Sequence, residues 1–167
     1  ASGELVIAKA SLSLNKLIVQ TLTDMEDTVK KSGLDIKLKI PEKDVLIISD
    51  GSRMYRVMQN IMENALKYSL KGTRIYITEF TEKNTVKLTI KNTASYEMDF
   101  TEEEILERFV RGDKSRNTDG NGLGLSIAKE FTAVCGGTFN IKIDGDQFNV
   151  IISFPIETDT IPEAEDI

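Results

Sequence analysis

The sequence predicts an α+β fold, a two-layer sandwich in which three main helices cover one face of a mixed sheet of about five or more strands. Two patterns indicate this fold. Apolar residues recur at helical spacing in three separate stretches, which start near Ser13, Asp50 and Leu123. Between these stretches, apolar and polar residues alternate in segments that mostly come in pairs, as is typical of strands with one open sheet face.

The first helical stretch runs from about Ser13 to Lys31 and is closed by Gly33, a residue common after the last turn of a helix. Alternation from Leu34 to Ile40 predicts a half-buried strand, and residues 45–48 form a short apolar run that predicts a buried strand. The N-terminal residues before this helix show no such pattern.

The second helical stretch begins after Asp50, whose side chain predicts an N-cap. The alternating segments over 74–91 and over 139–154 each predict a hairpin. The third helical stretch ends at Gly136. No stretch repeats, so the pattern predicts one domain with a single core.

The composition argues against several classes of function. The chain has 167 residues and a net charge of −6, which suits one acidic domain and argues against nucleic-acid binding. It contains no histidine, so it lacks the commonest general base and zinc ligand and cannot carry a phosphohistidine. Its single cysteine, Cys135, excludes an internal disulfide and is predicted to be buried. No apolar run approaches the roughly 18 residues that a membrane helix needs.

The stretch 92–121 has no strong period, and long loops inside compact domains usually serve a function. Thr101 followed by Glu104 predicts a capping box and one short helix within it. The end of the stretch is basic and includes Arg111, and arginines in such a loop suit phosphate contact. A solvated charged loop fits the same residues.

Three glycines at alternate positions, Gly120, Gly122 and Gly124, lead directly into the third helical stretch. A glycine loop that opens a helix directs free N–H groups and the positive end of the helix dipole at one point. This arrangement favours a phosphate, although a tight turn before a helix gives the same pattern.

A line of polar residues runs along the second helix. Asn60, Asn64 and Lys67 are four and three positions apart and share one helix face, with Tyr68 beside them. An amide oxygen is a ligand suited to Mg²⁺, and a lysine ammonium suits a phosphate. An ordinary solvated helix face remains an alternative for these residues alone.

Together, these motifs resemble a known family. The segment 60–69, Asn-Ile-Met-Glu-Asn-Ala-Leu-Lys-Tyr-Ser, resembles the N box of the GHKL ATPases in the form seen in sensor histidine kinases. The segment 107–116 resembles the kinase F box and the residues directly after that box, and Gly120 to Leu125 matches the second glycine box. Order and spacing agree with the family from about Leu34 to Phe154.

The resemblance implies the Bergerat ATP-binding fold with ATP and Mg²⁺ as cofactors. Asn64 would bind the metal, and Asn60 would support its water shell. Lys67 and Tyr68 would contact phosphate or ribose, and Arg111 would reach the phosphates from an ATP lid at about 92–121. The catalytic residues implied are therefore Asn60, Lys67 and Arg111. Phosphate would also be received along the glycine segment, at Gly120, Gly122, Leu123, Gly124 and Leu125.

One segment departs from the family pattern. The first glycine box normally reads Asp-x-Gly-x-Gly, and here the corresponding residues 92–96 are Asn-Thr-Ala-Ser-Tyr. The Asp usually accepts a hydrogen bond from the adenine amino group. Asn92 can accept one through its carbonyl oxygen, but without the charge. The sequence therefore predicts a variant nucleotide site.

The function implied is that of a sensor histidine kinase catalytic domain. It would donate the γ-phosphoryl of ATP to a histidine on a separate dimerisation domain, and the chain itself would not be self-phosphorylating. The expected organisation is a linker and first helix over 1–33, the ATP-binding domain over 34–155 and an acidic tail over 156–167. The parent would be a membrane-anchored homodimer that serves a response regulator, with this fragment cytoplasmic and monomeric.

Two alternatives stay open. A GHKL hydrolase places a Glu at the first N-box position, where this chain has Asn60, and Glu63 points about 100° away from Asn64 around the helix. A degenerate module that binds partners without nucleotide would explain the altered segment at Asn92.

Overall fold

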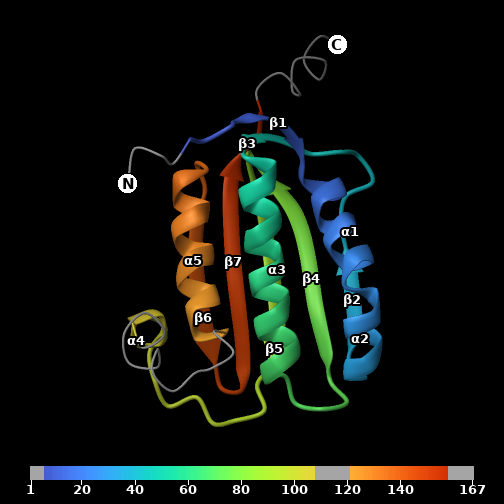
Figure 1. Ribbon diagram of the computed structural model, residues 1–167, viewed down its shortest axis with the longest axis vertical. Coiled ribbons are helices and arrows are strands. Elements are labelled where there is room, and N and C mark those ends of the chain that lie inside the picture. The colour runs from blue at the N-terminus through green and yellow to red at the C-terminus, as the bar shows by residue number, and fades with distance from the viewer. Residues whose placement is uncertain (1–5, 108–120, 158–167) are drawn as a thin grey trace.

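The structure is a computed structural model that describes residues 6–107 and 121–157, with only the backbone described at 107 and 121–123. It contains two sheets and a layer of helices (Figure 1). In chain order the elements are β1 (Ala10–Ser13), α1 (Leu14–Asp24), α2 (Glu26–Ser32), β2 (Asp35–Lys39), β3 (Leu46–Ser49), α3 (Gly51–Tyr68), β4 (Arg74–Glu82), β5 (Thr85–Thr93), α4 (Glu102–Glu107), α5 (Asn121–Val134), β6 (Thr138–Asp144) and β7 (Gln147–Pro155).

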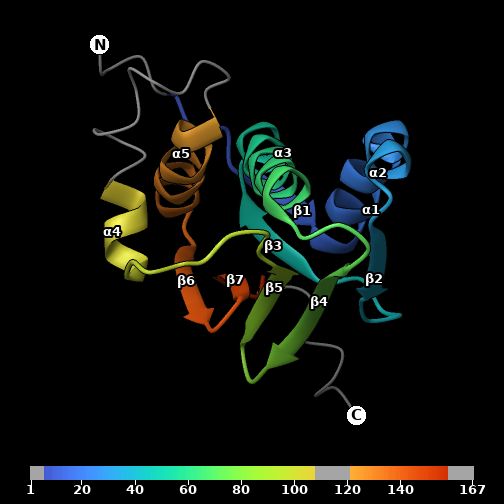
Figure 2. The same ribbon diagram turned by 90° about the horizontal axis from the view of Figure 1, so that it is seen from below.

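The main sheet has five strands in the order β2-β4-β5-β7-β6. Among the described strands of this sheet, only the β2–β4 pair is parallel and the other pairs are antiparallel, so the predicted mixed sheet is confirmed. The helices α1, α2, α3 and α5 lie on one side of this sheet, and within the described part of the chain its other side carries no helix (Figure 2). This arrangement confirms the predicted two-layer sandwich.

The core lies between the helix layer and the sheet. Alternate residues of β4, β5 and β7 are buried on the helix side, among them Ile77, Leu88 and Ile152. The apolar stripe of α3 packs against them and includes Met58 and Ile61. Cys135 is fully buried in this core, as predicted.

A second, two-stranded sheet was not expected. The segment predicted as a buried strand over 45–48 forms β3, which pairs antiparallel with β1 rather than joining the main sheet. The β1 segment has no clear alternation and takes its register from β3. The backbone amide of Glu157 also donates to the Leu46 carbonyl oxygen. The N-terminal strand β1 and the segment that follows β7, which are the two flanks of the domain, therefore both bond to β3.

The predicted helix 13–31 is broken. The chain bends at Met25, whose φ of −101° and ψ of 12° end α1, and α2 continues after it. The amide of Met25 still donates to Thr21 and its carbonyl accepts from Val29, so hydrogen bonds continue across the bend. Gly33 closes α2 in the left-handed conformation, as predicted.

The other predicted caps are confirmed. Asp50 accepts a hydrogen bond from the Arg53 amide at 3.1 Å and begins α3. Thr101 and Glu104 exchange side-chain to backbone hydrogen bonds at 2.8 and 3.1 Å, which is the reciprocal geometry of a capping box. Among the described residues, no helix is long and apolar enough to cross a membrane.

Candidate nucleotide site

The polar line on α3 lies largely inside the molecule. Asn60 is 9% exposed and Asn64 is 8% exposed, whereas Lys67 is exposed. The adjoining apolar residues of α3 face the core, and both amides are buried beside them. A solvated helix face therefore does not describe Asn60 and Asn64.

Asn60 joins α3 to the glycine segment. Its side-chain Nδ2 donates to the Gly124 carbonyl oxygen at 3.3 Å. A carbonyl oxygen only accepts, so this bond fixes the amide nitrogen toward α5 and leaves the amide oxygen as an acceptor. Residues 64 positions apart in the sequence are thereby placed side by side.

Asn64 carries a buried acceptor. Its Oδ1 atom is buried and has no hydrogen-bond partner among the described residues. An unpaired buried polar atom destabilises a fold by about 1–3 kcal/mol, so such an atom calls for a ligand. Amide oxygen is a suitable donor for a hard divalent cation such as Mg²⁺. The described residues contain no cluster of three carboxylate, histidine or cysteine side chains, so a cation here would depend on this amide and on the phosphates.

The C-terminal turn of α3 carries a cationic and aromatic cluster. The Lys67 ammonium lies 5.6 Å from the centre of the Tyr68 ring. The Tyr68 ring meets Tyr96 edge-on at 5.8 Å, and Tyr96 lies 6.2 Å from Phe100. These ring contacts connect Tyr68, at the end of α3, with the segment before α4 that contains Tyr96 and Phe100.

Asn92 is placed near this turn. It is 4% exposed and lies on the helix side of β5, paired with Ile75 and Phe148. The chain after it is tied to the end of α3, because Leu70 donates to Thr93 and Ser95 donates to Tyr68, both at 2.8 Å. The structure therefore brings Asn92 and the end of α3 together.

The glycine segment forms part of α5 itself. This helix begins at Asn121, so Gly122, Leu123 and Gly124 lie in its first turn. The sequence pattern instead predicts a glycine loop followed by a helix that starts near Leu123. The first four N–H groups of a helix lack intrahelical acceptors and are available to an anion. Leu125 is fully buried, so only its backbone can face a ligand. Gly120 and Arg111 lie outside the described residues.

Residues 49–158 match the family described as histidine kinase-, DNA gyrase B- and HSP90-like ATPases. The chain belongs to this family. Membership supports ATP binding and a catalytic role of the kinase type.

Similar proteins include sensor kinases from bacteria. The chain is 31% identical over 168 residues to the sensor protein KdpD of Escherichia coli, covering 99% of this chain and 18% of that protein. It is 33% identical over 128 residues to the E. coli sensor histidine kinase HprS, covering 77% of this chain and 27% of that protein. The chain thus spans less than a third of these relatives.

Solved structures show the same fold. The catalytic domain of histidine kinase ThkA superposes with a TM-score of 0.75 at 22% identity, covering 89% of this chain and 95% of that one. Histidine kinase AdeS of Acinetobacter baumannii gives a TM-score of 0.71 at 19% identity, covering 93% of this chain and 71% of that one. The sandwich is therefore that of a histidine kinase catalytic domain.

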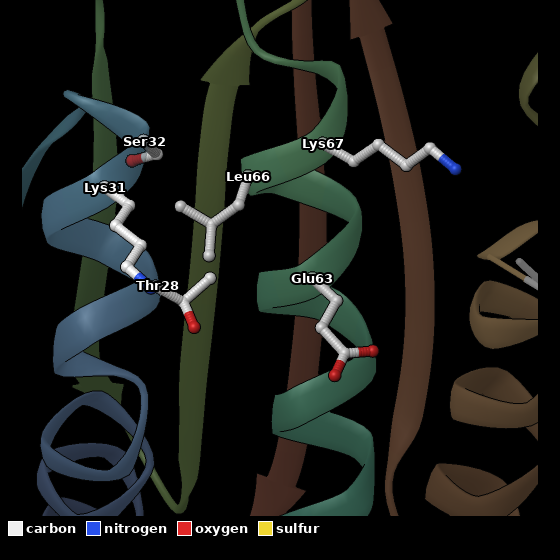
Figure 3. A pocket seen from close by; sticks show the side chains of 6 residues that line it. All are labelled: Thr28, Lys31, Ser32, Glu63, Leu66 and Lys67. Carbon is white, nitrogen blue, oxygen red and sulfur yellow. The ribbon is translucent and has the colours of Figure 1, made fainter.

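A separate groove lies between α2 and α3 of this kinase-type ATPase domain, with a volume of about 560 Å³. In Figure 3, Leu66 projects from α3 toward α2, whereas the ammonium of Lys67 points away from α2. Neither Asn60 nor Asn64 lines the groove. Lys67, a candidate site residue, borders this groove, so the groove adjoins the end of the polar line on α3.

Sequence reasoning missed two aromatic neighbours of the candidate site in this ATPase domain. Tyr96 and Phe100 join Tyr68 in an aromatic row, although their sequence neighbourhood shows no periodic signal. In the sequence, Tyr96 ends the segment that replaces the first glycine box, and Phe100 follows four residues later in a polar stretch.

Proposed function

We propose that this chain binds Mg·ATP and donates the γ-phosphoryl group to a histidine on a separate dimerisation domain of a two-component sensor kinase. Family membership supports the ATP-binding part of this proposal. The names of the relatives, which are sensor proteins and sensor histidine kinases, support the kinase part. The acceptor domain and the metal are the finer elements of the proposal.

The observation that carries the proposal is the pair of buried amides on α3. Asn60 is tied to the first turn of α5, and Asn64 presents a buried oxygen that has no partner among the described residues. Asn64 would hold the cation, and the free N–H groups in the first turn of α5 could receive phosphate. Magnesium bound there would neutralise phosphate charge, which is the main requirement of phosphoryl transfer.

Each remaining residue takes a role that suits its chemistry. Lys67 neutralises phosphate charge, and Tyr68 offers a ring and a hydroxyl to the ribose or phosphate. Asn92 accepts from the adenine amino group. Arg111 reaches the phosphates from the lid. The backbone that receives phosphate is the glycine segment, at Gly120, Gly122, Leu123, Gly124 and Leu125.

The wider organisation is part of the same proposal. A linker and first helix over 1–33 would join the ATP-binding domain, 34–155, to the dimerisation domain of the parent, and 156–167 would be an acidic tail. The parent would be a membrane-anchored homodimer that phosphorylates a response regulator. This domain would lie on the cytoplasmic side and would be monomeric as a fragment.

Transfer to histidine is favoured over hydrolysis by the residue at the first N-box position. Asn60 cannot deprotonate water, and its amide nitrogen is already bonded to Gly124. Glu63, the nearest carboxylate along α3, is exposed and points about 100° away from Asn64 around the helix. Water attack therefore lacks its usual base at the first N-box position.

The experiment combines binding with transfer. Calorimetric titration with Mg·ATP should give saturable binding, and radiolabelled ATP should give acid-labile phosphate only when the histidine-bearing domain of the parent is added as a separate chain. Steady-state release of inorganic phosphate by the chain alone would favour the hydrolase. No heat at about millimolar nucleotide would favour a partner-binding module.

Asn64→Ala tests the metal site. We expect Mg·ATP affinity to fall by about tenfold or more, because the variant lacks the amide oxygen, while circular dichroism stays close to wild type and the unfolding midpoint without nucleotide does not fall. Glu63→Ala, one position away on the exposed face, is the matched control and should bind normally. Unchanged affinity in Asn64→Ala would show that the metal assignment is wrong.

A further inference from the structure

The open face of the main sheet is strongly basic. The described helices cover only the other face (Figure 2), and alternation along the strands places five lysines on the open side. We call this surface the lysine face and define it by Lys37, Lys39, Lys87, Lys91 and Lys142. It forms part of a chain whose overall net charge is −6, so the distribution of charge is sharply uneven.

The strand registers spread these lysines in two dimensions. One row crosses the sheet through Lys37, Tyr76, Lys91, Asn149 and Lys142, each paired with the next. Lys39 lies two residues along β2 from this row, and Lys87 lies four residues along β5. Because side chains of one sheet face stand roughly perpendicular to the sheet, the ammonium groups end in a common layer.

Acidic residues on this side of the described strands lie at strand ends. Asp35 begins β2, Glu82 ends β4 and Asp144 ends β6. Two of them form ion pairs with the lysine face, Asp35 with Lys37 at 3.1 Å and Glu82 with Lys87 at 3.7 Å. These pairs are exposed, so they are worth little and exchange readily for another anion.

Two aromatic side chains project from the same face. Tyr76 is 42% exposed and Phe80 is 39% exposed, and both lie on β4. Tyr76 is paired with Lys37 of β2 and Lys91 of β5, and Phe80 is paired with Lys87 of β5. An aromatic ring with cations around it suits the boundary between water and an apolar layer. Exposed rings on an otherwise polar sheet face add little to the packing of the domain itself.

We propose that the lysine face docks on a membrane surface rich in anionic lipid. The charges are lysines, which act as hydrated point charges and suit a diffuse layer of phosphates. Single-stranded nucleic acid is instead bound along a groove that tracks its backbone, and this face spreads its charges over a broad sheet. At physiological salt, acidic residues elsewhere in the chain are largely screened from the lysine face, because the Debye length is about 8 Å.

The test measures co-sedimentation with vesicles. The chain should bind vesicles of phosphatidylcholine with about 40% phosphatidylglycerol, should ignore pure phosphatidylcholine, and should be released by about 0.5 M NaCl. The triple charge reversal Lys39→Glu, Lys91→Glu and Lys142→Glu should weaken binding by about 100-fold, since each basic residue near the surface contributes roughly fivefold.

The matched control reverses three exposed lysines of the helix layer, Lys16, Lys30 and Lys31, to Glu. It changes the net charge equally and should retain most vesicle binding. Equal loss in both triples, or no binding above that to neutral vesicles, would overturn the proposal. Preferential binding of polyuridylate RNA at the same salt would overturn the lipid assignment and indicate a nucleic-acid partner.

A second measurement does not depend on the triple variant folding. The chain contains no tryptophan, so Phe80→Trp supplies a single indole on the lysine face. Its emission should shift to the blue with anionic vesicles and stay unchanged with neutral vesicles. Unchanged emission with both types, under conditions in which the chain sediments with anionic vesicles, would show that another face makes the contact.

Discussion

Glu79 is a carboxyl group inside the core. It lies on the helix side of β4, is 3% exposed, and neither of its oxygens has a hydrogen-bond partner among the described residues. Burial, and then the nearby Asp44 carboxylate, raise the pKa of Glu79 from 4.5 to about 7. The folded chain therefore holds this proton at pH values where the unfolded chain has released it.

Stability should consequently depend on pH. Below about pH 4.5 the carboxyl is neutral in both states, and between pH 4.5 and about 7 only the unfolded chain ionises. The free energy of unfolding should fall by about 3 kcal/mol across that window and level off above it. Urea unfolding at several pH values measures this.

Glu79→Gln should remove most of this decrease, because a neutral amide does not titrate. Glu82→Gln is the control on the same strand and should keep the decrease, since the Glu82 side chain is 62% exposed. A slope unchanged in Glu79→Gln would assign the pH dependence to another group.

Asn92 offers a second prediction for a single residue. A carboxylate at this position would make a charge-assisted hydrogen bond to the adenine amino group, which is about twice as strong as a neutral one. Asn92→Asp should therefore raise the preference for ATP over GTP by about tenfold, at some loss of stability because the position is 4% exposed. Titrations with both nucleotides measure the ratio, and an unchanged ratio would place the adenine elsewhere.

At the scale of elements, the start of α3 is held by Asp50. Its side chain accepts from the amides of Arg53 and Ala8 at 3.1 and 3.0 Å, and from Arg53 Nη1 at 2.7 Å. Arg53 also donates to the Val6 carbonyl oxygen and lies 5.8 Å from the Phe131 ring of α5. Asp50 and Arg53 together thus connect the N-terminal segment with both helices of the candidate site.

Asp50→Ala should lower the free energy of unfolding by about 2–3 kcal/mol, because it removes a cap and leaves Arg53 without its ion pair. Hydrogen bonds, first of all from the Arg53 amide, lower the pKa of Asp50 below 3.8, so its contribution is complete above that pH and lost in stronger acid. Asp50→Asn keeps the cap and should lose less. Equal losses in both variants would mean that charge has no part.

The sequence patterns specified most elements because each reflects local physics. The caps at Asp50 and Thr101 were predictable from residue type and spacing alone. The bend at Met25 was not predictable, because apolar spacing continues through it. Strand β1 was missed since its partner β3 lies more than 30 residues away.

In the candidate site, too, features set by local spacing were predictable and contacts between distant segments were not. Helical spacing predicted that Asn60, Asn64 and Lys67 share a face of α3. It could not predict that Asn60 bonds to Gly124 or that Tyr96 meets Tyr68, because those contacts exist only after distant segments pack together.

At the scale of the whole molecule, nucleotide binding should stabilise the fold. Mg·ATP at about 100 times its dissociation constant should add about 2.7 kcal/mol, or roughly 5–10 °C in the unfolding midpoint. Differential scanning fluorimetry measures this shift. Chelation of magnesium with EDTA in the presence of ATP should remove most of it, and an equal shift without magnesium would show that the cation does not contribute.

The place where the chain enters and leaves the domain has a mechanical consequence. Strand β1 pairs with β3, and Glu157 bonds to the same strand, so both flanks lie at one end of the domain. The second half of α3, with Asn64 and Lys67, extends toward the other end (Figure 1). The domain is thus connected at one end, and a pull or twist on either flank would move the opposite end, where the candidate nucleotide site lies, through the widest arc.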